Sequence, residues 1–191
     1  KASGYQTCQI GKLHFQPHED NDLDPRQRND YGFDVFWLSE EPGPYEDAYV
    51  NFLRNEYSDI VDIMRVPRST SPARITEREG KVLNVPWEAS FSGWVAEQTS
   101  RYLGNHRDMS NFIHMGFYAP HPPNNPPKRF VDMYDSSQMP LPKMSEDQKE
   151  IWGLSDQQWQ KTKAYYYALV SHVDDQVGRI LQALEETGLR D

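Results

Sequence analysis

An apolar run from Asn111 to Tyr118 constrains the fold of this 191-residue chain more than any other feature. The run is nearly continuous, as in a strand that is buried on both faces of a sheet. A helical pattern precedes it over 89–105, and a longer one follows it from Ser155, a candidate N-cap, to Gly188. Helices that alternate with buried strands are typical of α/β proteins with a largely parallel sheet. The sequence therefore predicts an α/β fold.

The segments before this run have weaker patterns. Residues 6–15 suit a short strand that runs into a loop, and 33–38 are rich in β-forming residues. A proline at a first helical turn, followed by apolar residues at helical spacing, predicts a helix over 44–57. Residues 16–32 are turn-rich and predicted to be loop, and 58–86 show no sustained period.

The composition excludes several classes of protein. A net charge of −9 argues against nucleic acid and anionic membranes as general partners. An acidic chain that binds an anion must therefore gather its positive groups locally. No apolar stretch approaches the ~18 residues of a membrane span. The aromatic content of 13% argues against disorder. The length suits one sizeable domain or a large piece of one.

Lys12 and His14 stand where the first predicted strand gives way to loop. They lie two residues apart, so on a strand their side chains would point to the same side. An ammonium and an imidazole on one side can hold a tetrahedral oxyanion, the first as a point charge and the second as a directed donor. The same pattern also fits a strand end with a solvated lysine and a structural histidine.

His121 stands between prolines, directly after the apolar run. The prolines restrict the backbone and give the imidazole a preset direction at low entropic cost. Such a histidine suits a general acid, which must be held within reach of a leaving-group oxygen. A rigid loop with an exposed histidine is the alternative interpretation.

Other reactive residues have simpler interpretations. Cys8 lacks the Cys/His partner spacing of a nucleophile or a metal site, and a single cysteine excludes an internal disulfide. Asp174 and Asp175 point about 100° apart on a helix, which favours ion pairing or capping over a metal pair. The acidic loop 18–24 lacks the glycine and final glutamate of an EF-hand. Tyr165–Tyr167 are interpreted as core and helix surface. No role is assigned to His106, His114 and His172.

Together, these motifs resemble those of the sulfatase family within the alkaline-phosphatase superfamily. The resemblance is carried, in order across nearly the whole chain, by Gly11-Lys12-Leu13-His14, Pro120-His121-Pro122-Pro123 and Asp174-Asp175-Gln176-Val177-Gly178-Arg179. It implies a three-layer α/β/α sandwich with a mostly parallel central sheet. It also implies an enzyme that hydrolyses sulfate esters.

The resemblance gives each candidate residue a role. Lys12 would bind the sulfate ester and help hold the leaving oxygen, and His14 would lie beside the nucleophile and assist release of sulfate. His121 would contact the sulfate and protonate the departing alkoxide. These roles agree with what a lysine and two imidazoles can do near neutral pH.

The resemblance also implies a formylglycine nucleophile, made from a Cys-x-Pro-Ser/Ala-Arg motif, and Ca²⁺ held by Asp-rich segments. None of these motifs occurs in residues 1–191, so no metal ligand is assigned to this chain. We therefore expect residues 1–191 to be the middle portion of a sulfatase catalytic domain. By itself this portion would be inactive and would bind no calcium tightly.

The expected substrate is a small-molecule or carbohydrate sulfate ester. Loops on a rigid scaffold commonly set substrate choice, so the loops between Phe15 and Pro86 and over 124–127 are expected to shape its pocket. Two other functions remain open: hydrolysis of phosphonate monoesters or phosphodiesters, and an inactive relative that acts as a binding module. The resemblance favours a periplasmic or extracellular location, and the sequence indicates no oligomeric state.

Overall fold

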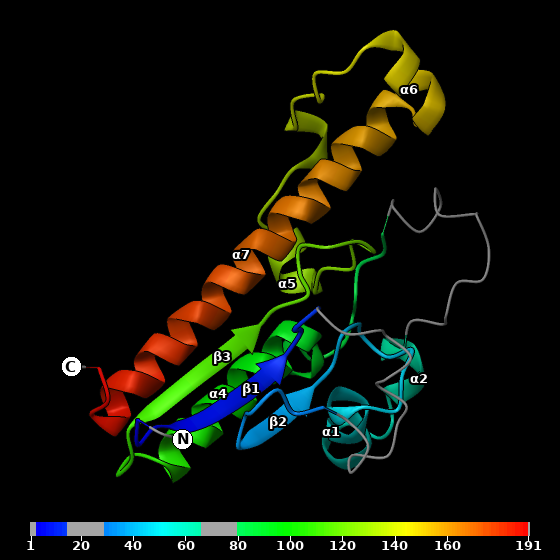
Figure 1. Ribbon diagram of the computed structural model, residues 1–191. Coiled ribbons are helices and arrows are strands. Elements are labelled where there is room, and N and C mark those ends of the chain that lie inside the picture. The colour runs from blue at the N-terminus through cyan, green and yellow to red at the C-terminus, as the bar shows by residue number, and fades with distance from the viewer. Residues whose placement is uncertain (1–2, 15–28, 66–79, 191) are drawn as a thin grey trace. The chain divides into compact units, whose positions relative to one another are not determined.

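The chain forms two compact units. Unit 1 comprises Lys1–Arg68, Glu88–Tyr118 and Asp175–Asp191, and unit 2 comprises Ser69–Trp87 and Ala119–Asp174. Figure 1 shows the computed structural model, which describes residues 3–14, 29–65 and 80–190. None of the described helices is long and apolar enough to cross a membrane.

Unit 1 contains a parallel three-stranded sheet, as Figure 1 shows. Its strands are β1 (Gln6–Gly11), β2 (Val35–Leu38) and β3 (Asn111–Gly116), in the order β2-β1-β3. Gly11, the last residue of β1, pairs with Leu38 of β2 and Gly116 of β3. The carboxyl ends of all three strands therefore meet at one edge. The predicted α/β fold with a parallel sheet is confirmed.

The burial predicted for β3 is wrong. Phe112 is 54% exposed and Met115 38% exposed, and β3 lies at the edge of the described sheet rather than at its centre. The central strand is β1, in which Cys8 and Ile10 are completely buried. The continuous apolar run thus correctly predicted a strand but not its place in the sheet.

Helix α4 (Phe91–Asn105) packs against β1 and β3. The Ser90 hydroxyl caps its first turn by accepting a hydrogen bond from the Gly93 N–H, and the 3-10 turn η2 (Trp87–Ala89) precedes it. Ala96 and Leu103 of α4 form a buried cluster with Ile180. The predicted helix over 89–105 is confirmed.

Helix α1 (Ala48–Glu56) begins later than the pattern predicted. Asp47 is its N-cap, and the carboxylate accepts a hydrogen bond from the Val50 N–H. Pro44 therefore lies before the helix and not in its first turn. A short helix α2 (Val61–Met64) follows, in a segment without a sustained period.

Unit 2 contains short helices that the sequence analysis did not predict. They are α5 (Lys128–Val131), η3 (Ser136–Gln138) and α6 (Glu146–Trp152). The long helix α7 (Asp156–Thr187) begins after Ser155, whose hydroxyl accepts from the Gln158 N–H as an N-cap does. Residues of α7 up to Asp174 belong to unit 2, and the rest belong to unit 1.

Candidate active site

Lys12 follows β1 at the carboxyl edge of the sheet. Its backbone N–H donates to the Gly116 carbonyl over 2.9 Å. The half-buried side chain donates to the Glu40 carbonyl over 2.9 Å, and Nζ lies 5.0 Å from the centre of the Tyr118 ring. Burial lowers the pKa of Lys12, while the carboxylates of Glu40 and Glu41 act in the opposite direction.

His14 has an unusual backbone conformation. Its φ of 58° lies in the left-handed region, which residues other than glycine adopt rarely. The backbone N–H points at the Glu40 carboxylate, 2.9 Å from Oε1 and 2.8 Å from Oε2. The imidazole itself is exposed. The alternation of a strand does not apply to Lys12 and His14, because β1 ends at Gly11.

One residue, Glu40, therefore contacts both candidates: its carbonyl accepts from Lys12 and its carboxylate from His14. Glu40 is completely buried and lies two residues after β2. The sequence analysis did not identify it. The available signal was its place after a strand that pairs in parallel with β1, since such residues meet at the same edge of the sheet.

His121 lies in unit 2, in the loop that follows β3, and is exposed. Its Nδ1 is 2.6 Å from the Pro122 carbonyl oxygen. A carbonyl oxygen only accepts, so this contact requires the proton on Nδ1. Nε2 is then the acceptor nitrogen of the neutral ring. The flanking Ala119–Pro120 and Pro122–Pro123 peptide bonds are cis.

The loop that carries His121 is braced by a second segment of unit 2. The Leu83 N–H donates to the Pro126 carbonyl over 2.9 Å, and the Lys128 N–H donates to the Leu83 carbonyl over 3.1 Å. The Lys81 N–H donates to Asn125 Oδ1 over 2.9 Å. Residues 124–127, which the sequence predicted to help shape the substrate pocket, are thus held by a regular set of hydrogen bonds.

The structure brings Lys12 and His14 together through Glu40, and it places His121 in the other unit. The interpretation of Cys8 as a structural residue is confirmed, because burial is complete and raises the pKa of its thiol to about 12. A thiol in that state is a poor nucleophile at neutral pH. The interpretation of the tyrosines is also confirmed: Tyr165 is buried, and its two successors are exposed.

No group of three or more His, Cys, Asp or Glu side chains that could hold a metal ion occurs within 3–14, 29–65 and 80–190. Asp175 instead accepts a hydrogen bond from the Gln176 side chain. The acidic loop 18–24 lies outside the described residues. The described part of the chain does not fit a calcium site, and no metal-dependent step is assigned to it.

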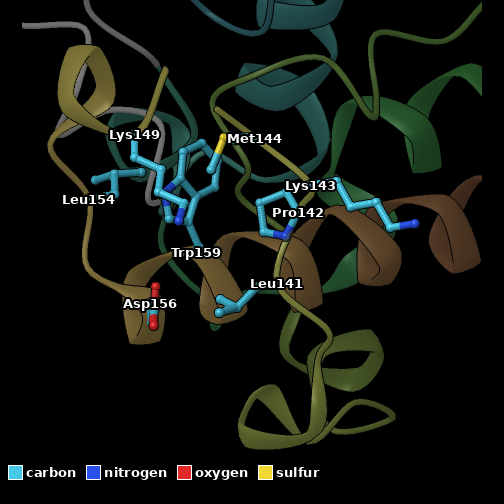
Figure 2. A pocket seen from close by; sticks show the side chains of 8 residues that line it. All are labelled: Leu141, Pro142, Lys143, Met144, Lys149, Leu154, Asp156 and Trp159. Atoms are coloured by element: carbon cyan, nitrogen blue, oxygen red, sulfur yellow. The ribbon is translucent and has the colours of Figure 1, made fainter. Parts of the chain in front are cut away.

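Unit 2 has a separate cavity of about 300 Å³ next to α6. Figure 2 shows the Trp159 ring beside Met144 and Lys149, while the ammonium of Lys143 points away from them. None of the predicted catalytic residues lines this cavity. It is therefore not part of the candidate site around Lys12 and His14.

Comparison with known proteins identifies related chains. A family model described as Sulfatase matches residues 1–191. The chain is 29% identical over 225 residues to an arylsulfatase of Clostridium perfringens, covering 97% of this chain and 42% of that protein. It is 27% identical over 135 residues to PehA of Trinickia caryophylli, described as a multifunctional protein of the alkaline phosphatase superfamily, covering 56% of this chain and 26% of PehA.

The fold is also found among solved structures. A phosphonate monoester hydrolase of Agrobacterium radiobacter superposes with a TM-score of 0.67 at 20% identity, covering 97% of this chain and 42% of that one. The chain therefore has an alkaline-phosphatase-like α/β fold, as predicted. It spans less than half the length of these relatives.

Proposed function

Since the chain belongs to the sulfatase family, we propose that the full-length protein hydrolyses sulfate esters. The observation that carries this proposal is the pairing of Lys12 and His14 at the carboxyl edge of the parallel sheet, both held by Glu40. In α/β proteins, ligands commonly bind outside this edge. A held ammonium and an exposed histidine two residues along the chain suit the binding of a small tetrahedral anion.

The roles proposed for the three residues follow from their chemistry. The Lys12 ammonium offsets the negative charge of the sulfate group and of the leaving oxygen. The His14 imidazole donates a hydrogen bond to the same anion. As the ester S–O bond breaks and its electron pair passes to the oxygen of the departing alcohol, protonated His121 transfers its Nε2 proton to that oxygen.

The nucleophile and the residues that bind the metal are proposed to lie in parts of the protein other than residues 1–191. Sulfatases generally use a metal ion, and we propose calcium for this protein, together with a formylglycine nucleophile. We propose a small-molecule or carbohydrate sulfate ester as the substrate, and a periplasmic or extracellular location. The calcium proposal predicts that exhaustive chelation of the full-length protein abolishes turnover and that added Ca²⁺ restores it, whereas full activity after chelation would contradict it.

A direct test uses the full-length protein with 4-nitrophenyl sulfate. Lys12→Ala should lower kcat/KM by about 10²–10³-fold, as does the loss of other groups that stabilise a developing charge. Lys149→Ala is the matched control, because Lys149 is exposed in unit 2 and pairs with Glu146. Equal activity of wild type and Lys12→Ala would count against the proposed role of Lys12.

Phosphonate monoester or phosphodiester hydrolysis is the second candidate function. The similarities to PehA and to a phosphonate monoester hydrolase favour it. The same preparation should be assayed with 4-nitrophenyl phenylphosphonate and bis(4-nitrophenyl) phosphate. A higher kcat/KM for either than for the sulfate would favour this second function, and no turnover of any ester would favour an inactive binding protein.

A further inference from the structure

We propose that Glu40 is the positioning residue of this site, and that its carboxylate sets the place of the His14 imidazole for reaction. This inference rests on the proposed function, because it concerns the same ester hydrolysis. Nothing in the sequence motifs points to Glu40. The inference comes from its contacts with the two residues that carry the anion-binding chemistry.

The first support is the contact with His14. Both carboxylate oxygens of Glu40 lie within 2.9 Å of one backbone N–H. A completely buried carboxylate must have hydrogen-bond partners. His14 also has a left-handed backbone, a conformation that persists only when the surroundings enforce it. The Glu40 carboxylate provides that constraint, and it thereby sets the direction in which the His14 side chain extends from the backbone.

The second support is the rigidity of the segment that carries Glu40. The Ser39 N–H donates to the Gly11 carbonyl over 3.2 Å, which continues the pairing of β2 with β1. The Ser39 hydroxyl donates to Asp47 Oδ2 over 2.6 Å, and Asp47 caps α1. The residue before Glu40 is therefore bonded to both a strand and the cap of a helix, which holds the backbone of Glu40 in place.

The third support is that Glu40 contacts Lys12 through a different group. Lys12 donates to the backbone carbonyl of Glu40, which any substitution at position 40 retains. Among the residues that the structure describes, the groups that act on the ammonium are Glu40 and Glu41 after β2 and the Tyr118 ring after β3. A change of the Glu40 side chain therefore alters the His14 contact and one charge near Lys12. Variants that change only the contact or only the charge separate these two effects.

The experiment is a double-mutant cycle on the full-length protein with 4-nitrophenyl sulfate. Glu40→Gln removes the charge and one of the two acceptor oxygens. We expect it to lower kcat by about 10- to 100-fold, since misplacement of a reacting group by about 1 Å can have an effect of that size. In the His14→Ala background the same change should have little effect, because there is no imidazole left to position.

Glu41→Gln is the matched control for charge. It removes a neighbouring carboxylate that also raises the pKa of Lys12, and it leaves the contact between Glu40 and His14 in place. Both variants should move the alkaline limb of the pH–rate profile to lower pH, but only Glu40→Gln should lower kcat at the optimum. Glu40→Asp retains the charge on a shorter side chain, so we expect it to lower kcat and leave the limb unmoved.

A purely structural role for Glu40 predicts a different result. It would lower thermal stability and reduce activity by the same factor with or without the His14 side chain. That outcome, or unchanged kcat in Glu40→Gln and Glu40→Asp, would overturn the inference while the proposed function stands. Should Glu40→Gln fail to fold, the cycle is completed with Glu40→Asp. A wild-type protein that hydrolyses no ester would overturn the proposed function itself.

Discussion

At the scale of single residues, the contact of the His121 ring bears on the proton-transfer role proposed for it. Its Nδ1 lies 2.6 Å from the Pro122 carbonyl oxygen, a contact that places the Nδ1 proton on that side of the ring. Only the other ring nitrogen, Nε2, is therefore proposed to donate a proton to the leaving-group oxygen. The benefit of a general acid depends on how poor the leaving group is, so the role of His121 is tested best by comparing leaving groups.

His121→Ala in the full-length protein should slow hydrolysis of alkyl or sugar sulfates far more than that of activated aryl sulfates. General-acid assistance contributes about 10²–10⁴-fold, and a good leaving group needs little of it. The measurement is kcat/KM for a series of sulfate esters that differ in leaving-group pKa. Equal losses across the series would contradict the assignment.

The lowered pKa of Lys12 predicts a loss of activity at alkaline pH. Burial lowers its pKa, so the ammonium loses its proton at a lower pH than an exposed lysine does. Activity that needs the charge should fall as pH rises through this pKa. In Lys12→Arg the limb should disappear, because arginine stays protonated, although kcat at the optimum should be lower. A limb at the same pH in Lys12→Arg would assign it to another group.

The sequence predicted these residues to different degrees. Lys12, His14 and His121 could be singled out because each follows a predicted strand and bears a charge or an imidazole. Glu40 also follows a predicted strand and bears a charge, but its contact with His14 depends on the parallel register of β1 with β2 and on a left-handed backbone. Neither of these is encoded in the type of residue found at position 40.

At the scale of elements, capping residues were better guides than apolar spacing. The start of α7 after Ser155 was predicted from a hydroxyl that can cap a helix, and the structure confirms it. The start of α1 was misplaced because Pro44 was preferred over Asp47, the true cap. For α6, the capping box of Ser145 and Gln148 was present in the sequence but surrounded by too little apolar pattern to be recognised.

Two glycines give opposite predictions at this scale. Gly178 is exposed within α7, and a methyl group there meets nothing within 4 Å. Gly178→Ala should therefore stabilise the protein by about 0.5–1 kcal/mol, the helix preference for alanine. Gly116 ends β3, and a methyl group there would overlap the Lys12 carbonyl. Gly116→Ala should destabilise it by about 1–3 kcal/mol, as other overpacked sites do.

The free energy of unfolding, measured with denaturant, should rise in Gly178→Ala and fall in Gly116→Ala. Unchanged m-values would indicate that only stability has changed. Gly116→Ala should also reduce activity, because the methyl group displaces the segment that carries Lys12. A Gly116→Ala protein as stable as wild type would mean that this close approach relaxes without cost.

At the scale of the whole molecule, the fold class could be predicted but the exposure of the sheet could not. Alternating helices and strands were sufficient for a parallel α/β fold, because few other arrangements bury such strands. The place of β3 at the edge of the sheet depends on which strands pair with each other. The apolar pattern within a single segment does not contain that information. The division into two units was likewise not visible in the composition.

Helix α7 contributes residues to both units, which predicts how they unfold. Val173→Pro would interrupt the helix near the change from one unit to the other, at a cost of about 3 kcal/mol or more. Hydrogen exchange should then accelerate both in β1 of unit 1 and in α5 of unit 2, whereas Val173→Ala should change little. Acceleration confined to one unit would show that the two open independently.

The contact of Glu40 with Lys12 and His14 also has a consequence for folding fidelity. Parallel strands can pair in alternative registers, and a slip of one residue reverses which side chains face the core. If β2 slipped against β1, Glu40 would no longer stand opposite the His14 N–H. Molecules with the wrong register would then lose this contact and be much less active, so specific activity would report the accuracy of strand pairing as well as the amount of folded protein.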